Sequence, residues 1–402
     1  MAYDVERVRS LYPALNQPGE RTVFLDGAAG TQSPQSVIDA VAGAYRAGTS
    51  NAGGYFATSV RADENTAAAR SAVADLVNGD PRGVVLGPNM TTLTYRFAQA
   101  LSRQWQLGDN LVVSRLDHDA NVRPWVQWAE RAGIETRWAD VDVTTGELPV
   151  EQYRELVDER TRLVAVTAAS NVLGTRPDIR AITDIAHAAG ALAYVDGVHA
   201  TAHGVVDIKA LGSDFYATSA YKWDGPHVGC VIADPELLET LHPDKLASSS
   251  DDVPDRFEWG TPSFHDFAGV AAAVEHLAAL DPEAQGTRRE RLVTSLGAAE
   301  EHESALFGRL LAALDADPRI TTYGHAARRT ATAYFRLAGQ SPDQTAQALA
   351  ARGINVWSGH NYAWEVTAAL GIRDTGSAIR ASLAHYSDDT DVDRLLGALA
   401  EL

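Results

Sequence analysis

The sequence predicts an α/β protein that has a mostly parallel sheet and a smaller second domain. Its 402 residues, of which 45% are hydrophobic and 22% charged, suffice for a large core and for two domains. Short runs rich in β-branched residues alternate with alanine-rich helical stretches through the first two thirds of the chain. This alternation is typical of crossover connections between parallel strands.

Five of these runs are the predicted strands of the large domain, and polar residues follow them. The runs are residues 83–86, 110–113, 163–167, 192–195 and 229–232, with a predicted helix at 179–189. Asn89, His118, Asn171 and Asp196 each come just after or at the end of a predicted strand. Ligands of parallel sheets bind beyond the carboxyl ends of the strands, so we expect these side chains to converge on one crevice.

The C-terminal third is predicted to form the smaller domain, with strands near 331–337 and 378–385. We expect an N-terminal segment (1–20) that packs on the small domain, a large domain (21–265), a linking helix (266–285) and a small α+β domain (286–402). The stretch 248–255 is polar and poor in apolar residues, which predicts a loop or a mobile flap.

The charge balance and the single cysteine limit the classes of partner. The formal net charge is −19, from 34 basic and 53 acidic residues, which argues against a nucleic acid or an anionic membrane as partner and favours a small molecule. The amphipathic start and the lack of an 18-residue apolar span predict a cytoplasmic protein. Cys230 alone can form neither an intramolecular disulfide nor a thiolate metal cage, and no metal site is expected.

Two residues have the properties that a pyridoxal phosphate site requires. Asp196 ends the apolar run in YVDG (194–197), and Lys222 follows in SAYK (219–222). A pyridoxal phosphate enzyme needs a lysine that holds the aldehyde as a Schiff base and a carboxylate that keeps the pyridine nitrogen protonated. Both are present in the expected order. The alternative is a surface lysine and an aspartate that caps a strand end.

Seven motifs carry a family resemblance. They are LDGAAG (25–30), DHDANVRPW (117–125), SNVLGT (170–175), VDGVHA (195–200), TSAYK (218–222), FEWGTP (257–262) and IRASLAHY (379–386). In order and spacing they resemble the class V aminotransferase group and, more narrowly, the cysteine desulfurase and selenocysteine lyase family, from about residue 4 to the C-terminus. The resemblance implies a fold-type I enzyme with a seven-stranded sheet. It also implies a homodimer in which Thr261 reaches the cofactor phosphate across the interface.

The resemblance further implies a role for each matching residue near the cofactor. Lys222 would hold the cofactor and act as the base at Cα, because a desolvated lysine beside a cationic ring loses its proton readily. Asp196 would pair with the pyridinium nitrogen, and His118 would stack on the ring and relay protons. The remaining cofactor contacts would come from Asn89, Met90, Asn171, His199, Ser219, Tyr221 and Thr261.

The substrate side of the site departs from the family. Arg380 would bind the substrate carboxylate through its planar fork, and Asn171 and Trp357 are further candidate substrate contacts. Gly54 could let a substrate approach the backbone closely, and the alternative is a plain turn. Desulfurases carry sulfur on a loop cysteine, but Tyr362 stands at that position here, and a tyrosine cannot carry a persulfide. Tyr362 and His360 are candidate catalytic residues that could protonate a leaving group, or they could be packing residues of the rim.

Three hypotheses for the function follow. The first is an enzyme that removes the Cα proton of an amino acid and expels a β-substituent, a C–S lyase without a persulfide relay. The second keeps the cofactor and changes the outcome to epimerisation, transamination or replacement at Cβ or Cγ in a specialised biosynthetic pathway. The third is a non-catalytic homologue, which is disfavoured because Lys222, Asp196, His118 and Arg380 are all present.

Overall fold

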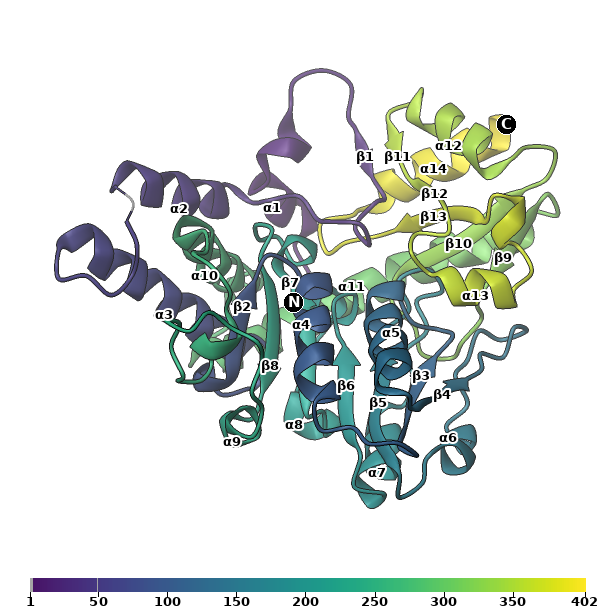
Figure 1. The fold of residues 1–402 in the computed structure, drawn as a ribbon. Coiled ribbons are helices and arrows are strands. Elements are labelled where there is room, and N and C mark those ends of the chain that lie inside the picture. Colours follow the sequence, from purple (N-terminus) through teal and green to yellow (C-terminus); the bar gives the residue numbers. More distant parts are fainter. Residues whose placement is uncertain (1–2, 49) are drawn as a thin grey trace.

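The computed structural model describes residues 3–48 and 50–402, and its centre is a seven-stranded sheet (Figure 1). The strand order is β2 (Val84–Gly87), β8 (Gly229–Ala233), β7 (Phe215–Ser219), β6 (Leu192–Asp196), β5 (Thr161–Thr167), β3 (Asn110–Ser114) and β4 (Glu135–Ala139). Only β8 runs antiparallel to its neighbours in this sheet, so the predicted α/β class with a mostly parallel sheet is confirmed.

Helices cover both faces of this sheet because its strands alternate between two apolar cores. Val113 and Ala165 pack on one face with Phe97 and Trp125, which come from α4 (Met90–Ser102) and α5 (Arg123–Ala132). The other face is covered mainly by α3 (Ala57–Val77), α7 (Ile179–Ala188), α10 (Phe264–Ala278) and the first half of α11 (Arg288–Ala316). Strands buried on both faces account for the continuous apolar runs in the sequence.

The C-terminal part is built on a second, antiparallel sheet. Its order is β12 (Trp357–Gly359), β13 (Ala378–Ser382), β10 (Thr332–Leu337) and β9 (Ile320–Tyr323). The second half of α11, α12 (Pro342–Ala350) and α14 (Asp389–Glu401) pack with this sheet around a third apolar core. The strands predicted near 331–337 and 378–385 correspond to β10 and β13.

Shorter elements complete the chain. They are α1 (Val5–Ser10), β1 (Val23–Phe24), α2 (Gln35–Arg46), α6 (Glu151–Leu156), α8 (Ile208–Leu211), α9 (Pro235–Glu239), β11 (Ile354–Asn355) and α13 (Trp364–Ala369). Strand β1 pairs with β11, which ties the N-terminal part to the C-terminal part. None of the helices in residues 3–48 and 50–402 combines the length and the apolar character needed to cross a membrane.

The order of the strands determines where functional side chains can meet. The parallel strands end at the same edge of the sheet. Asp196 is the last residue of β6 and Ser219 the last of β7. Asn89 follows β2, and His118 follows β3. The C-terminal sheet lies beside this edge in Figure 1.

Candidate active site

A crevice of about 1010 Å³ opens between the carboxyl edge of the large sheet and residues of the C-terminal sheet. Nine predicted site residues line it: Asn89, His118, Asn171, Tyr221, Lys222, Trp357, His360, Tyr362 and Arg380. Seven predicted site residues line the narrow inner end, and three of them are additional to those nine: Met90, Asp196 and His199. The structure thus brings together most of the side chains that sequence reasoning selected.

Lys222 and Asp196 lie at the inner end of the crevice. Lys222 ends a short 3-10 turn after β7 and is 7% exposed, whereas Asp196 ends β6 and is 4% exposed. One oxygen of Asp196, Oδ1, accepts a hydrogen bond from the Val198 N–H at 2.9 Å. Burial and the charge of Arg380 lower the pKa of Lys222, and burial raises the pKa of Asp196. A cation placed beside Asp196 would counteract that rise.

One hydrogen bond determines which nitrogen of the neutral His118 ring carries the proton. Its Nδ1 accepts the N–H of Ala120 at 3.1 Å, so the ring proton resides on Nε2. Burial, together with the charges of Lys222 and Arg380, lowers the pKa of His118 to about 3. The imidazole is therefore neutral at physiological pH, which suits it to lie against a cationic aromatic ring.

Arg380 and Asn171 leave polar atoms without partners inside the crevice. Arg380 is on β13 and donates from Nη1 to the Asn171 carbonyl at 3.1 Å, while its Nε has no partner. The Asn171 side chain donates to the Asn361 carbonyl at 2.8 Å, and its Oδ1 is buried without a partner. Burial lowers the pKa of Arg380 to about 10. Because buried polar atoms are rarely unpaired, these groups indicate a binding site for a polar ligand.

The start of α4 borders the inner end of the crevice. Asn89 caps this helix by accepting the Thr92 N–H at 2.9 Å, and Met90 donates its N–H to the Ser219 hydroxyl at 3.0 Å. The helix can approach β8 this closely because residue 229 is glycine. A Cβ there would lie 2.2 Å from the backbone of Asn89. A helix N-terminus favours an anion such as phosphate.

Together these groups fit pyridoxal phosphate. A buried amine, a buried carboxylate and a neutral imidazole lie at the inner end, and a helix N-terminus lies beside them. The unpaired Asn171 Oδ1 and Arg380 Nε offer further polar contacts to a cofactor and its substrate. Two more predicted contacts line the same space. His199 Nε2 is hydrogen-bonded to the hydroxyls of Thr330 and Thr332, each at 3.0 Å, and the Tyr221 ring stacks on His227.

The outer rim of the crevice carries Tyr362 and His360 in an unusual backbone conformation. Asn361 and Tyr362 have φ angles of +49° and +59°, which cost roughly 1–2 kcal/mol per residue without glycine. The Tyr362 carbonyl accepts the Asp119 N–H at 2.8 Å, and its ring centroid lies 5.3 Å from that of His118. The Tyr362 N–H donates to His360 at 3.0 Å. These contacts hold the phenol over His118, with 67% of the residue exposed to the crevice and solvent.

Gly54 and Thr261 lie outside the crevice of their own chain. Gly54 precedes α3 and donates its N–H to Ser59 at 2.6 Å. Thr261 is exposed beside Trp259, near the carboxyl end of β2. Neither residue lines the space around Lys222 in this single chain. The single chain therefore does not bring these two residues to the predicted site.

Several lining residues were not predicted, and three of them carry polar groups of interest. Thr91 follows the helix cap of α4, Tyr95 lies one turn farther on, and Arg123 begins α5. The signal for Thr91 was available, because a hydroxyl in the first turn after a predicted strand is a common anion contact. Arg123 gave no such signal, since it is held by Asp119 at 2.9 Å and by Glu365 from distant α13.

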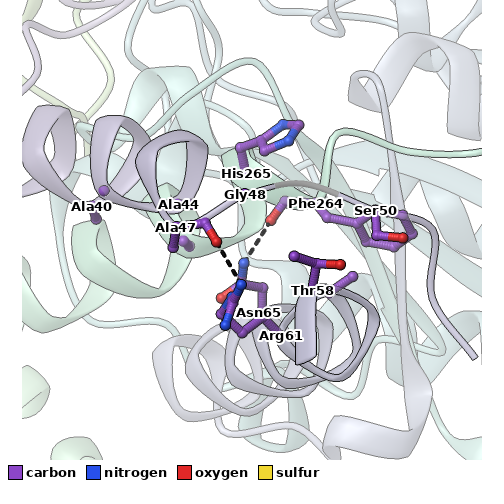
Figure 2. Close-up of a pocket in the computed structure, with 13 residues that line it drawn as sticks. Ala40, Ala44, Ala47, Gly48, Ser50, Thr58, Arg61, Asn65, Phe264 and His265 are labelled. Carbon is purple, nitrogen blue, oxygen red and sulfur yellow. Dashed lines mark hydrogen bonds between the residues drawn. The ribbon is translucent and has the colours of Figure 1, made fainter. Parts of the chain in front are cut away.

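A second hollow, of about 270 Å³, lies between α2, α3 and the start of α10 (Figure 2). Its walls are mostly small apolar side chains. Arg61 and Asn65 already donate to the carbonyls of Ala47 and Phe264, and the His265 ring stacks on Tyr45. No lysine or carboxylate is among the described residues that line the hollow, so the crevice at Lys222 is the candidate active site.

Cys230 cannot take part in the chemistry of the crevice from its place in the fold. It is fully buried in β8, as expected for a structural cysteine, and burial raises the pKa of its thiol. It does not line the crevice.

Comparisons with known proteins agree with this geometry. The family described as aminotransferase class-V matches residues 23–395. The chain is 39% identical over 406 residues to an uncharacterized protein of Mycobacterium tuberculosis, with all of both chains covered. It is 33% identical over 425 residues to a cysteine desulfurase of Klebsiella pneumoniae, which covers 100% of this chain and 99% of that protein. The solved cysteine desulfurase CsdA of Escherichia coli has a TM-score of 0.86 at 28% identity, with 100% and 98% of the two chains covered.

These matches span almost the whole chain, including every motif that lines the crevice. The predictions of a pyridoxal phosphate enzyme and of a desulfurase-like sequence are confirmed. The chain belongs to the class V aminotransferase family, within its cysteine desulfurase-like group.

Proposed function

We propose that the protein is a C–S lyase that acts on an amino acid of the cysteine type and releases its sulfur group without a persulfide relay. The observation that carries this proposal is which reactive side chains the rim of the crevice contains. Tyr362 and His118 face each other there, whereas the one thiol, Cys230, is buried in β8. A sulfur relay needs an accessible thiolate, and a β-elimination needs only a base and a proton donor.

The base would be Lys222. Bound pyridoxal phosphate supplies an electron sink that acidifies the Cα–H bond of the substrate. Arg380 would hold the substrate carboxylate with its fork, which orients Cα toward the Lys222 amine. Because the pKa of Lys222 is lowered, much more of its amine is free to accept the proton than in a surface lysine.

The proton donor would be Tyr362. When the Cβ–S bond breaks, its electron pair goes to sulfur, and the electrons of the Cα–H bond form the Cα–Cβ double bond. The sulfur then needs one proton. The neutral ring of His118 cannot act as an imidazolium acid at a pKa of about 3, so the neighbouring phenol is the better placed donor. The product hydrolyses to pyruvate and ammonia.

The active unit would be a homodimer, with Thr261 and the Gly54 loop completing the crevice of the partner. Both lie away from their own crevice, which supports this assignment. Tyr55 and Phe56, beside Gly54, are 104% and 59% exposed. Exposed aromatic side chains next to one another are typical of a protein interface.

Incubation of the loaded enzyme with cysteine, S-alkylcysteines and cysteine sulfoxides tests the proposal. We expect pyruvate, ammonia and an intact thiol or sulfenate in equal amounts, and no product from the Lys222→Ala control. A Cys230→Ala variant should keep full activity. Alanine formed together with protein-bound sulfur would contradict the proposal, and so would a Cys230→Ala variant without activity. Racemised or transaminated substrate without sulfur release would favour the second hypothesis.

A further inference from the structure

Four distant segments of the chain meet at one buried hydroxyl on the far side of the lysine turn. The Tyr12 hydroxyl lies 2.8 Å from Asp224 Oδ2, 2.7 Å from His276 Nε2 and 2.7 Å from His385 Nε2. His385 Nε2 is also 3.2 Å from the same carboxylate oxygen. All four side chains are buried, with at most 8% of any of these residues exposed. We call these four residues the Tyr12 cluster.

Each member comes from an element with its own relation to the active site. Asp224 lies two residues after Lys222, and His385 lies shortly after the strand β13 that carries Arg380. His276 is in α10, and Tyr12 precedes the 3-10 turn of the N-terminal segment. The cluster therefore connects the turn that holds the lysine with the strand that holds the arginine.

The Tyr12 hydroxyl can bond all three of its neighbours without an ion, while the other oxygen of Asp224, Oδ1, is buried without a partner among the described residues. The Tyr12 O–H can donate to Asp224, and each histidine can donate its Nε2–H to the tyrosine oxygen, which accepts two bonds. Two histidines and a carboxylate are also the ligands of many metal sites. Here, however, the tyrosine oxygen already occupies the position between them, in contact with all three. A zinc ion about 2.0–2.2 Å from each would have to displace it.

The backbone conformation of Asp224 is an independent reason to assign a function to its side chain. Its φ is +71°, in the left-handed region that glycine adopts most easily and aspartate tolerates. Its N–H donates to the Thr31 hydroxyl at 2.7 Å. A glycine would fit this backbone with less strain but would lose the carboxylate. The carboxylate that binds Tyr12 and His385 is thus the feature that the position requires.

We propose that the Tyr12 cluster is a positioning unit, which fixes the Lys222 turn relative to the Arg380 strand and makes the N-terminal segment a functional part of the active site. None of its members touches the crevice, so they act through Lys222 and Arg380 and not on the substrate. The effect on turnover rests on the proposed function, but the effect on Lys222 does not.

Tyr12→Phe is the decisive variant, because it keeps the ring and removes only the shared hydroxyl. Asp224→Asn keeps the shape and the left-handed backbone and removes the charge. Tyr386→Phe is the matched control: its ring lies 5.0 Å from that of Tyr12, it is equally buried, and its hydroxyl bonds only the Gln32 N–H outside the cluster. Each apoprotein is mixed with pyridoxal phosphate, and the absorbance of the lysine-bound cofactor is followed as a function of pH.

We expect Tyr12→Phe to shift the pH midpoint of cofactor attachment by about 0.5, a roughly three-fold change in the fraction of free amine. With a turned-over substrate it should lower kcat about 10-fold with a smaller change in KM, because Lys222 acts after binding. Tyr386→Phe should change neither quantity. If Asp224→Asn does not fold, Tyr12→Phe alone decides.

Two outcomes would overturn the positioning role. One is a Tyr12→Phe protein whose pH midpoint and kcat match those of Tyr386→Phe. The other is one equivalent of a transition metal in the purified protein that Asp224→Asn lacks, which would make the cluster a metal site. A shifted pH midpoint in a protein that releases sulfur from no substrate would support the positioning role and overturn the C–S lyase proposal alone.

Discussion

Lys222 is buried near two side chains of opposite charge, and burial and both charges together determine how readily its amine reacts. Arg380 lowers its pKa, Asp196 opposes that change, and burial contributes more than either. A bound pyridinium would partly neutralise Asp196, which strengthens the relative influence of Arg380. The arginine therefore has two separable effects, one on the substrate carboxylate and one on the lysine.

An Arg380→Gln substitution should raise the pKa of Lys222, because a positive charge that disfavours the ammonium form is removed. The apoprotein should then bind pyridoxal phosphate covalently more slowly at pH 7, and the pH midpoint of attachment should move upward. Absorbance of the lysine-bound cofactor measures both. Arg380→Lys keeps the charge and loses the fork, so it should keep the midpoint and raise KM for the amino acid. An unchanged midpoint in Arg380→Gln would contradict this account.

Tyr362→Phe tests the proton donor at the rim. If the phenol protonates the departing sulfur, its loss should lower kcat by about 10²-fold and leave KM nearly unchanged. Steady-state kinetics with an S-alkylcysteine measure the effect. Tyr95→Phe is the control. Tyr95 lines the same crevice, and its hydroxyl donates to Gln127 at a distance of 3.2 Å, on a side away from His118. Equal rates for both variants would mean that Tyr362 only packs on the rim.

At the level of elements, the site depends on strand ends that lie side by side. The five predicted strands all occur within about two residues of their expected bounds, and Asp196 ends β6 and His118 follows β3 as expected. Strands β4 and β7 were not predicted. Strand β4 is an edge strand with charged residues and lacks an apolar run, and β7 is five residues that continue directly into the lysine turn.

The rim loop could not be derived from the sequence. Its left-handed residues, Asn361 and Tyr362, are held by the Asp119 N–H and by Asn171, which are far away in the chain. Local sequence preference disfavours such a backbone for tyrosine. Only the resemblance to the desulfurase loop indicated that this stretch lies near the substrate.

Gly197→Ala should disrupt the end of β6. An added Cβ would meet the Tyr216 ring at 1.9 Å, and that buried ring cannot move away freely. We expect a loss of about 1–3 kcal/mol in the free energy of unfolding and weaker cofactor binding, measured by denaturant unfolding and by absorbance. Gly308→Ala, within α11 and facing open space, is the control and should stabilise by up to ~1 kcal/mol. Equal stability of the two variants would contradict the packing argument.

At the level of the whole molecule, α11 joins the two halves. Its 29 residues span roughly 44 Å at about 1.5 Å per residue. Leu292 and Leu296 pack in the core of the large sheet, whereas Leu306 and Leu310 pack in the C-terminal core. The division at residues 265 and 286 stays a prediction, and the structure adds that α10, within the predicted link, packs on α2 and α3.

Dimer formation should depend on the exposed aromatic residues before α3. A Tyr55→Glu, Phe56→Glu double variant should be monomeric and bind pyridoxal phosphate at least about 10-fold more weakly, because charge is placed in an apolar contact and Thr261 of the partner is lost. Light scattering after size-exclusion chromatography measures the mass. Leu107→Glu changes an 83% exposed residue elsewhere and should leave the mass unchanged. A wild-type monomer with tightly bound cofactor would contradict the prediction.

A physical reason therefore separates the site residues that the sequence predicts from those that it does not. Asp196 and His118 could be predicted because they lie at the ends of predicted strands, whereas Lys222 was found from the SAYK motif and the family resemblance. Tyr12 and Asp224 could not, because their meeting depends on how the N-terminal segment packs behind the lysine turn. The predicted roles of Gly54 and Thr261 would need a contact that one chain does not contain.

The place of Cys230 makes this protein convenient for site-specific labelling. Its thiol is fully buried in β8 and should resist a thiol reagent while the sheet is intact. A cysteine introduced on the surface would then be the one reactive thiol of a native subunit, so a single probe per chain could report distances across a dimer. In the unmodified protein, the rate at which Cys230 is labelled would measure how often the central sheet opens, without any substitution.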